Sequence, residues 1–134
     1  MSKTRLIAVT LIATLAAVGM MATPAVVNAQ NMHTSKAFSG PKANKGTVTH
    51  SKMNGKNMLT LSDDFVVPDT PDPHWMLVDS KGTTFLVQKL KVKNDGYNKS
   101  IEIPAYVKDV KKVIIWCAWA ETNLGEAEFT QAVK

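Results

Sequence analysis

The sequence predicts an all-β protein, a two-sheet antiparallel β-sandwich of about seven or eight strands. From Gly46 onward, short runs rich in β-branched residues alternate with turn residues, and such runs spaced about eight to twelve residues apart are typical of sandwiches and barrels. The dipeptide Asn54-Gly55 lies between two of these runs and favours a two-residue hairpin loop. The 134 residues, 45% of them hydrophobic, are enough for one domain.

Local patterns predict the individual strands. The run Val113-Ile114-Ile115-Trp116-Cys117-Ala118-Trp119 predicts a central strand that is buried on both faces for part of its length. The alternating segment at 125–129 predicts an edge strand. Further strands are predicted around residues 47–51, 58–61, 75–78, 83–87 and 101–104, with residues 90–93 either extending one of them or forming another.

Two segments are expected to differ from this pattern. Three prolines, Pro68, Pro71 and Pro73, mark a corner and should lie outside any central strand, because proline cannot donate a ladder hydrogen bond. Residues 105–112 are the one place where a helical turn fits, since Tyr106 and Val110 are four residues apart.

The N-terminal segment has the parts of a secretory signal peptide. Two cations, Lys3 and Arg5, precede the apolar run 6–21. Cleavage is expected after Ala29, with a cut after Ala25 as the second choice. A retained anchor is the alternative, although the run is shorter than the roughly 20 residues that span a bilayer.

These signals divide the chain into four parts. We expect a cleaved signal peptide at 1–29, a flexible leader at 30–36, the sandwich domain at 37–129 and a tail at 130–134. The protein is then secreted or periplasmic, with no stable membrane insertion after cleavage.

Charge and motif content exclude several classes of function. Residues 30–134 carry fourteen lysines and no arginine against eleven Asp plus Glu, a net charge of +3. The lack of arginine argues against a nucleic-acid partner, because base readout favours the guanidinium group. A single cysteine excludes an intramolecular disulfide, a four-cysteine zinc site and a C-x-x-C redox pair. No haem-attachment motif, serine-hydrolase elbow, phosphate-binding glycine loop or blue-copper ligand loop is present, so no enzyme activity is indicated.

Cys117 is the main candidate for chemistry, with Trp116, Trp119 and Trp75 as supporting residues. One interpretation is a redox-active or metal-binding thiolate in an oxidising compartment. The other is a small buried hydrophobic residue, because free cysteines are among the most buried residues. Strand alternation makes Cys117 and Trp116 point in opposite directions. Trp75 is expected in the core, where its indole N–H needs a partner.

Metal sites have weaker support. Imidazole, thioether and thiolate are the donors that Cu(I) prefers, but nothing in the sequence fixes the convergence of His33, His50, His74 and the methionines at 32, 53, 58 and 76. Among the histidines, His50 and His74 are the candidates retained. Aspartates 63, 64, 69 and 72 are a conceivable calcium loop, but turn and capping roles explain them better, because the glycine and terminal glutamate of an EF-hand are lacking.

From about Ala37 to Phe129 the chain resembles the DM13 domain family. The resemblance rests on the order of Phe38-Ser39-Gly40, Gly46-Thr47-Val48, Leu59 to Phe65, Pro71 to Leu77, Ile103-Pro104, Val113 to Cys117 and Gly125-Glu126-Ala127. It implies a secreted or periplasmic β-sandwich with a proposed electron-transfer role, in which Cys117 matches the family's suggested redox-active cysteine. In animal proteins the domain occurs beside DOMON domains, which bind haem or sugar. Asn98, Ile101 and Trp119 depart from the family pattern.

Two functions are therefore expected as alternatives. The first is an exported redox or electron-transfer accessory module centred on Cys117, with a redox protein as partner and with haem and copper open as cofactors. The second is a non-catalytic binding or adhesion module of the cell envelope, in which Cys117 only packs and the corner from Pro68 to Pro73 is the contact surface. A weaker third option is metal handling through histidine and methionine.

Overall fold

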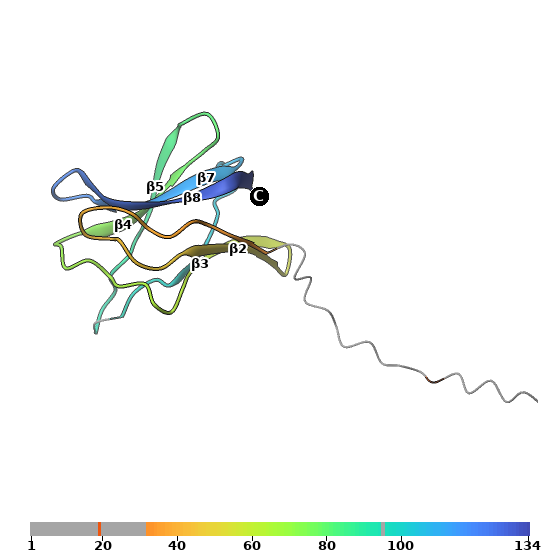
Figure 1. Cartoon of the computed structure of the whole chain (residues 1–134), viewed down its shortest axis with the longest axis horizontal. Coiled ribbons are helices and arrows are strands. Elements are labelled where there is room, and N and C mark those ends of the chain that lie inside the picture. Colours follow the sequence, from red (N-terminus) through yellow and green to blue (C-terminus); the bar gives the residue numbers. More distant parts are fainter. Residues whose placement is uncertain (1–18, 20–31, 95) are drawn as a thin grey trace, which may run out of the picture.

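The computed structural model describes Gly19 and residues 32–94 and 96–134. The expected signal peptide, 1–29, lies outside these residues except for Gly19. In the described part, eight strands form two antiparallel four-stranded sheets without a helix, which confirms the all-β sandwich (Figure 1). Accordingly, no helix there has the length and apolar character that crossing a membrane requires.

One sheet has the strand order β1-β2-β3-β6 and the other β5-β4-β7-β8. Their bounds are β1 His33–Thr34, β2 Val48–Met53, β3 Lys56–Leu61, β4 Pro73–Val78, β5 Thr84–Lys89, β6 Ser100–Glu102, β7 Val110–Cys117 and β8 Thr122–Val133. The two layers are seen nearly edge-on in Figure 1, with β2 and β3 below β7 and β8.

The hairpin predicted at Asn54-Gly55 is confirmed. Met53 pairs with Lys56 across a two-residue loop. Asn54 and Gly55 have φ angles of 50° and 76°, and two left-handed residues in succession define the hairpin turn whose twist matches the flanking strands. This loop fixes the register of β2 on β3.

The predicted central strand is also confirmed. β7 lies between β4 and β8, and the successive residues Val113, Ile114 and Ile115 are all buried. A strand that is covered on both faces loses the polar alternation of a half-exposed strand. The apolar run was therefore a reliable signal.

Two expectations about irregular segments were wrong. Pro73 is the first residue of β4, an interior strand; the first position tolerates proline, and its carbonyl still accepts a hydrogen bond from the Leu90 N–H at 2.7 Å. Residues 105–112 contain a turn but no helix, and β7 begins within them at Val110. Pairing of Val110 with Val133 overrides the weak local helical pattern.

Both ends of the domain extend further than expected. Residues 33 and 34 of the expected leader form β1, and residues 130–133 of the expected tail belong to β8. Between β1 and β2, the chain runs along the outer edge of β8: Lys36 N–H donates to the Glu128 carbonyl at 2.8 Å, and Ser39 N–H donates to the Glu126 carbonyl at 2.9 Å. This segment covers an edge that would otherwise expose unpaired backbone groups.

The core lies between the sheets and centres on large buried side chains. Trp75 in β4 is fully buried, and its indole N–H donates to the carbonyl of Asn98 at 2.9 Å. This confirms the expectation that Trp75 lies in the core with a partner for its N–H. Phe129, Leu59, Leu61 and Leu77 are buried in the same cluster.

Candidate functional site

Cys117 is the last residue of β7 and points into the core. It pairs with Pro73 on β4 and with Thr122 on β8, and only 1% of it is exposed. Trp116, one residue earlier, is half-buried. The predicted opposition of the two side chains is therefore confirmed, and the cysteine occupies the inner face.

Although Cys117 is buried, its sulfur does not lie in purely apolar surroundings. The backbone N–H of Ala120 lowers the pKa of the Cys117 thiol by hydrogen bonding to the sulfur, against an opposing effect of burial. The N–H groups of Asp72 and Trp119 act in the same direction. Donors that hydrogen-bond the charged form stabilise the thiolate.

Thr70 belongs to the proline corner and also influences the sulfur. Its hydroxyl makes the smallest contribution to lowering the pKa of Cys117. Thr70 Oγ1 is buried and has no hydrogen-bond partner of standard geometry among the described residues. The sulfur is thus approached from the β7–β8 turn on one side and from the segment preceding β4 on the other.

The remaining tryptophans lie differently. Trp119, at the tip of the β7–β8 hairpin, is 75% exposed, while its backbone N–H contributes to lowering the pKa of Cys117. Trp116 lies opposite His74 on the outer face of its sheet. Of the three supporting tryptophans, Trp119 is the one that has a strongly exposed ring and also influences Cys117 through its backbone.

The two histidines retained as metal candidates lie in different sheets. His74, in β4, is 9% exposed, and its Nδ1 lies 3.0 Å from the Asp72 carbonyl and 3.5 Å from Asp72 Oδ1. His50, in β2, is 2% exposed and lies opposite His33 of β1. The structure therefore pairs His50 with His33 rather than with His74.

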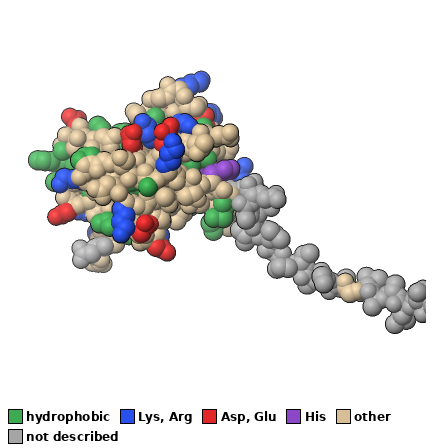
Figure 2. Space-filling view, viewed as in Figure 1, with side chains coloured by type: hydrophobic (Ala, Val, Ile, Leu, Met, Phe, Trp, Pro, Cys, Tyr) green, Lys and Arg blue, Asp and Glu red, His purple; other side chains and the backbone are tan. Residues whose placement is uncertain are grey.

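The geometry of the His33–His50 pair is close. Their Nδ1 atoms are 3.3 Å apart, and their ring centroids are 5.5 Å apart with planes inclined by 20°. His50 Nε2 lies 3.0 Å from Asn57 Oδ1 on β3. Figure 2 shows a histidine at the surface beside the end of β8, which Figure 1 marks as the C-terminus.

Three of the four aspartates of the conceivable calcium loop face separate lysines. Asp63 contacts Lys99, whose hydrogen bond lowers the pKa of Asp63. Asp69 Oδ1 lies 3.8 Å from Lys91 Nζ, and Asp72 Oδ1 lies 3.7 Å from Lys89 Nζ. In the part of the chain that the structure describes, no group of three or more His, Cys, Asp or Glu side chains could hold a metal ion.

The methionines do not assemble around the histidines as one cluster. Met32 and Met53 are exposed, and Met58 and Met76 are half-buried on strands of different sheets. Sequence reasoning missed Thr70 and Asn57. Asn57 follows the recognisable hairpin turn, but its proximity to His50 depends on the pairing of β2 with β3.

Comparisons with protein-family models, with curated proteins and with solved structures found no match to this chain.

Proposed function

We propose that this chain is an exported, DM13-like module with a redox accessory role centred on the Cys117 thiolate. The proposal is carried by the lowered pKa of the buried Cys117 thiol, to which the backbone N–H groups of Ala120, Asp72 and Trp119 contribute. Such donors favour the thiolate, which is the nucleophilic form of cysteine. The resemblance to the DM13 family supports the same residue.

The proposed chemical step is oxidation of Cys117 by a peroxide. The thiolate sulfur attacks one peroxide oxygen, an S–O bond forms, the O–O bond breaks, and hydroxide leaves and takes a proton from solvent. The sulfur has then lost two electrons and become a sulfenic acid. A thiol of a partner condenses with it, so that an S–S bond forms and water leaves.

Access to the sulfur determines which reagents react. Cys117 is 1% exposed, and the turn that follows it carries the exposed residues Trp119, Ala120 and Glu121. Hydrogen peroxide is only slightly larger than water, whereas an alkylating reagent needs more room. We therefore expect native Cys117 to react with peroxide more readily than with iodoacetamide, relative to the unfolded chain.

We predict that treating the native protein with hydrogen peroxide, removing the peroxide and then unfolding the chain in glutathione converts Cys117 to a mixed disulfide, detected by intact mass. Unfolding gives glutathione access to a sulfenic acid that formed at the buried sulfur. Cys117→Ser should show no such mass gain, with circular dichroism confirming its fold. The thiolate absorbance should appear with a midpoint below that of free cysteine, because backbone N–H donors lower the pKa of Cys117. Thr70→Val should raise this midpoint, whereas the matched variant Thr130→Val, on exposed β8, should not.

The contribution of Cys117 to the stability of the fold should depend on pH in a defined direction. Because the pKa of Cys117 is lowered in the folded state, its contribution to stability is complete above the pKa of the unfolded thiol. It is lost as the pH falls through the folded pKa. A native protein that gains no glutathione after peroxide treatment and unfolding, and whose thiol titrates at or above the midpoint of free cysteine, would rule out the redox role and leave Cys117 as a packing residue.

One observation favours the alternative, a non-catalytic binding module of the cell envelope. Trp119 is 75% exposed on a hairpin tip, and large aromatic residues that are exposed in the free protein are common anchors at interfaces. The adjoining segment that precedes β4, with Asp72 and Thr70, belongs to the proline corner.

For this alternative, we predict that Trp119→Ala lowers retention of the protein on isolated cell envelopes by roughly tenfold or more, as expected for an interface anchor. Leu86→Ala, at a 48% exposed apolar residue on β5, is the matched control and should bind normally. Cys117→Ser should also bind normally if the cysteine is structural. Equal retention of Trp119→Ala and the unmodified protein would exclude Trp119 as the contact.

A further inference from the structure

We propose that His33 and His50 form a binding site for one exchangeable divalent transition-metal ion, with Zn²⁺ as the test case. The two residues face each other directly across the β1–β2 ladder. Directly opposite residues on antiparallel strands project to the same face with their Cβ atoms about 4.5–5.5 Å apart. The backbone therefore holds both imidazoles on one side of the sheet.

The hydrogen bond to Asn57 prepares His50 as a ligand. Asn57 Oδ1 lies 3.0 Å from His50 Nε2, and an amide oxygen can only accept, so Nε2 carries the proton. In the neutral ring, Nδ1 then keeps its lone pair. A hydrogen-bonded acceptor on the second ring nitrogen is how proteins fix the tautomer and orientation of metal-binding histidines.

The electrostatic surroundings of His50 are also defined. Burial lowers the pKa of His50, the Asn57 hydrogen bond opposes this effect, and His33 and Lys52 lower the pKa further. The charged groups facing the pair are Lys52 and Lys134, which line the same cavity.

The separation of the two nitrogens fits a shared ion. Tetrahedral Zn²⁺ with Zn–N bonds of about 2.0–2.1 Å places two ligand nitrogens about 3.3–3.4 Å apart. The observed separation of the two Nδ1 atoms is 3.3 Å, which exceeds the usual length of about 2.7–3.2 Å for a hydrogen bond donated by N–H. The observed separation is thus long for a hydrogen bond between the two rings, whereas it matches the distance between two nitrogens that coordinate one ion.

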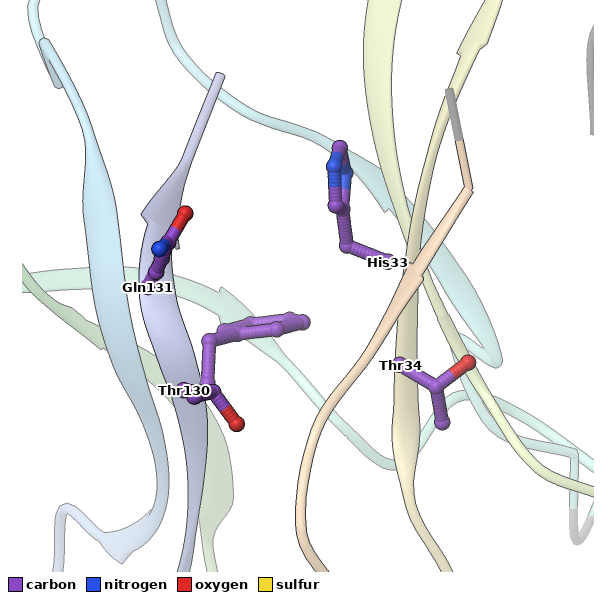
Figure 3. A pocket seen from close by; sticks show the side chains of 5 residues that line it. His33, Thr34, Thr130 and Gln131 are labelled. Carbon is purple, nitrogen blue, oxygen red and sulfur yellow. The ribbon is translucent and has the colours of Figure 1, made fainter. Parts of the chain in front are cut away.

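The surroundings leave room for solvent ligands. A cavity of about 220 Å³ lies between β1 and β8, lined by His33, Thr34, Phe129, Thr130 and Gln131. Figure 3 shows the side chains of His33 and Gln131 on opposite sides of this opening. A second cavity, of about 190 Å³, adjoins both histidines. Water can therefore complete the coordination of an ion held by two imidazoles.

The surroundings also set the strength of the site. Two protein ligands and two nearby lysines give weaker binding than a closed four-ligand site, so the ion exchanges. Because β1 has only two residues, an ion bound to both strands would hold the start of the domain on β2 and raise its stability by mass action.

The test is titration of the untagged protein with ZnCl₂, followed by calorimetry and by nitrogen-detected histidine NMR. We expect one Zn²⁺ per chain, with shifts at Nδ1 of both His33 and His50 while Nε2 of His50 stays protonated. His33→Gln should weaken Zn²⁺ binding at least tenfold, and because His33 is exposed, this variant should fold. His74→Gln, at the histidine of the other sheet, is the control and should bind as the unmodified protein does.

Asn57→Ala tests the positioning role separately. Loss of the partner of a metal-binding histidine typically weakens affinity by about 10- to 100-fold, and here the Nε2 proton signal of His50 should also lose its protection from exchange. Zn²⁺ binding by His33→Gln equal to that of the unmodified protein, or Nδ1 signals that do not respond to Zn²⁺, would overturn the proposal and leave the pair as a contact between strands.

Discussion

Gly125→Ala is expected to lower the free energy of unfolding by about 3 kcal/mol or more, at the upper end of the cost of overpacking. Gly125 lies in β8 opposite Ile115, under the segment that covers the edge of this strand. A Cβ at Gly125 would lie 2.7 Å from the Cβ and 2.8 Å from the carbonyl carbon of Ala43, and would also strike the Ala43 carbonyl oxygen. The crossing backbone would have to move.

That backbone cannot move without breaking hydrogen bonds. The N–H groups of Lys42 and Ala43 donate to the Leu124 carbonyl at 2.9 and 2.7 Å, and Ala43 is 1% exposed. Displacing the segment would leave a buried carbonyl without its partners, which adds about 1–3 kcal/mol. Only glycine allows the two chain segments to approach so closely.

Urea denaturation followed by circular dichroism measures this loss. Gly55→Asn is the matched control, because Gly55 has a φ of 76° and a Cβ at this position would have no heavy atom within 4 Å beyond its chain neighbours. Asparagine also tolerates this left-handed conformation. We expect the control to lose less than about 1 kcal/mol. Similar losses in the two variants would show that the contact with Ala43 is not the cause.

Trp75→Ala should destabilise the protein by about 3–5 kcal/mol, the usual cost of truncating a buried tryptophan. Trp75 is fully buried in β4 and faces the inter-sheet core. Its removal also leaves the Asn98 carbonyl without the indole donor at 2.9 Å. Both the cavity and the unpaired carbonyl lower the free energy of unfolding.

Two further variants separate these causes. Trp75→Phe keeps an aromatic ring but no N–H, so it should recover part of the loss. Trp119→Ala, at an exposed tryptophan, should change the free energy of unfolding by less than about 0.5 kcal/mol. Chemical denaturation followed by circular dichroism avoids the change in tryptophan fluorescence. A Trp119→Ala loss as large as that of Trp75→Ala would contradict the assigned positions.

Much of the fold follows from local signals. Asn54-Gly55 specifies a turn through the conformations its residues tolerate, and the apolar run ending at Cys117 specifies an interior strand. Alternation alone was enough to place Cys117 and Trp116 on opposite faces. The β1 strand was missed because two residues carry too little pattern to be recognised.

The composition of the two candidate sites, in contrast, could not be predicted from local signals. Cys117 was recognisable as the single cysteine, but the donors at its sulfur come from the turn after β7 and from Thr70 and Asp72, more than forty residues earlier. His33 and His50 carried no signal of a pair, since only the register of β1 on β2 makes them neighbours.

By itself, the sequence determined where most of the longer strands lie, where one hairpin turns and that Cys117 and Trp116 face opposite sides of β7, because backbone conformation and alternating burial are properties of neighbouring residues. Tertiary structure alone decided that Pro73 begins an interior strand, that residues 130–133 extend β8, and which groups meet at Cys117 and at His50. Those outcomes depend on pairing between segments distant in the chain, which is set by the packing of the whole core.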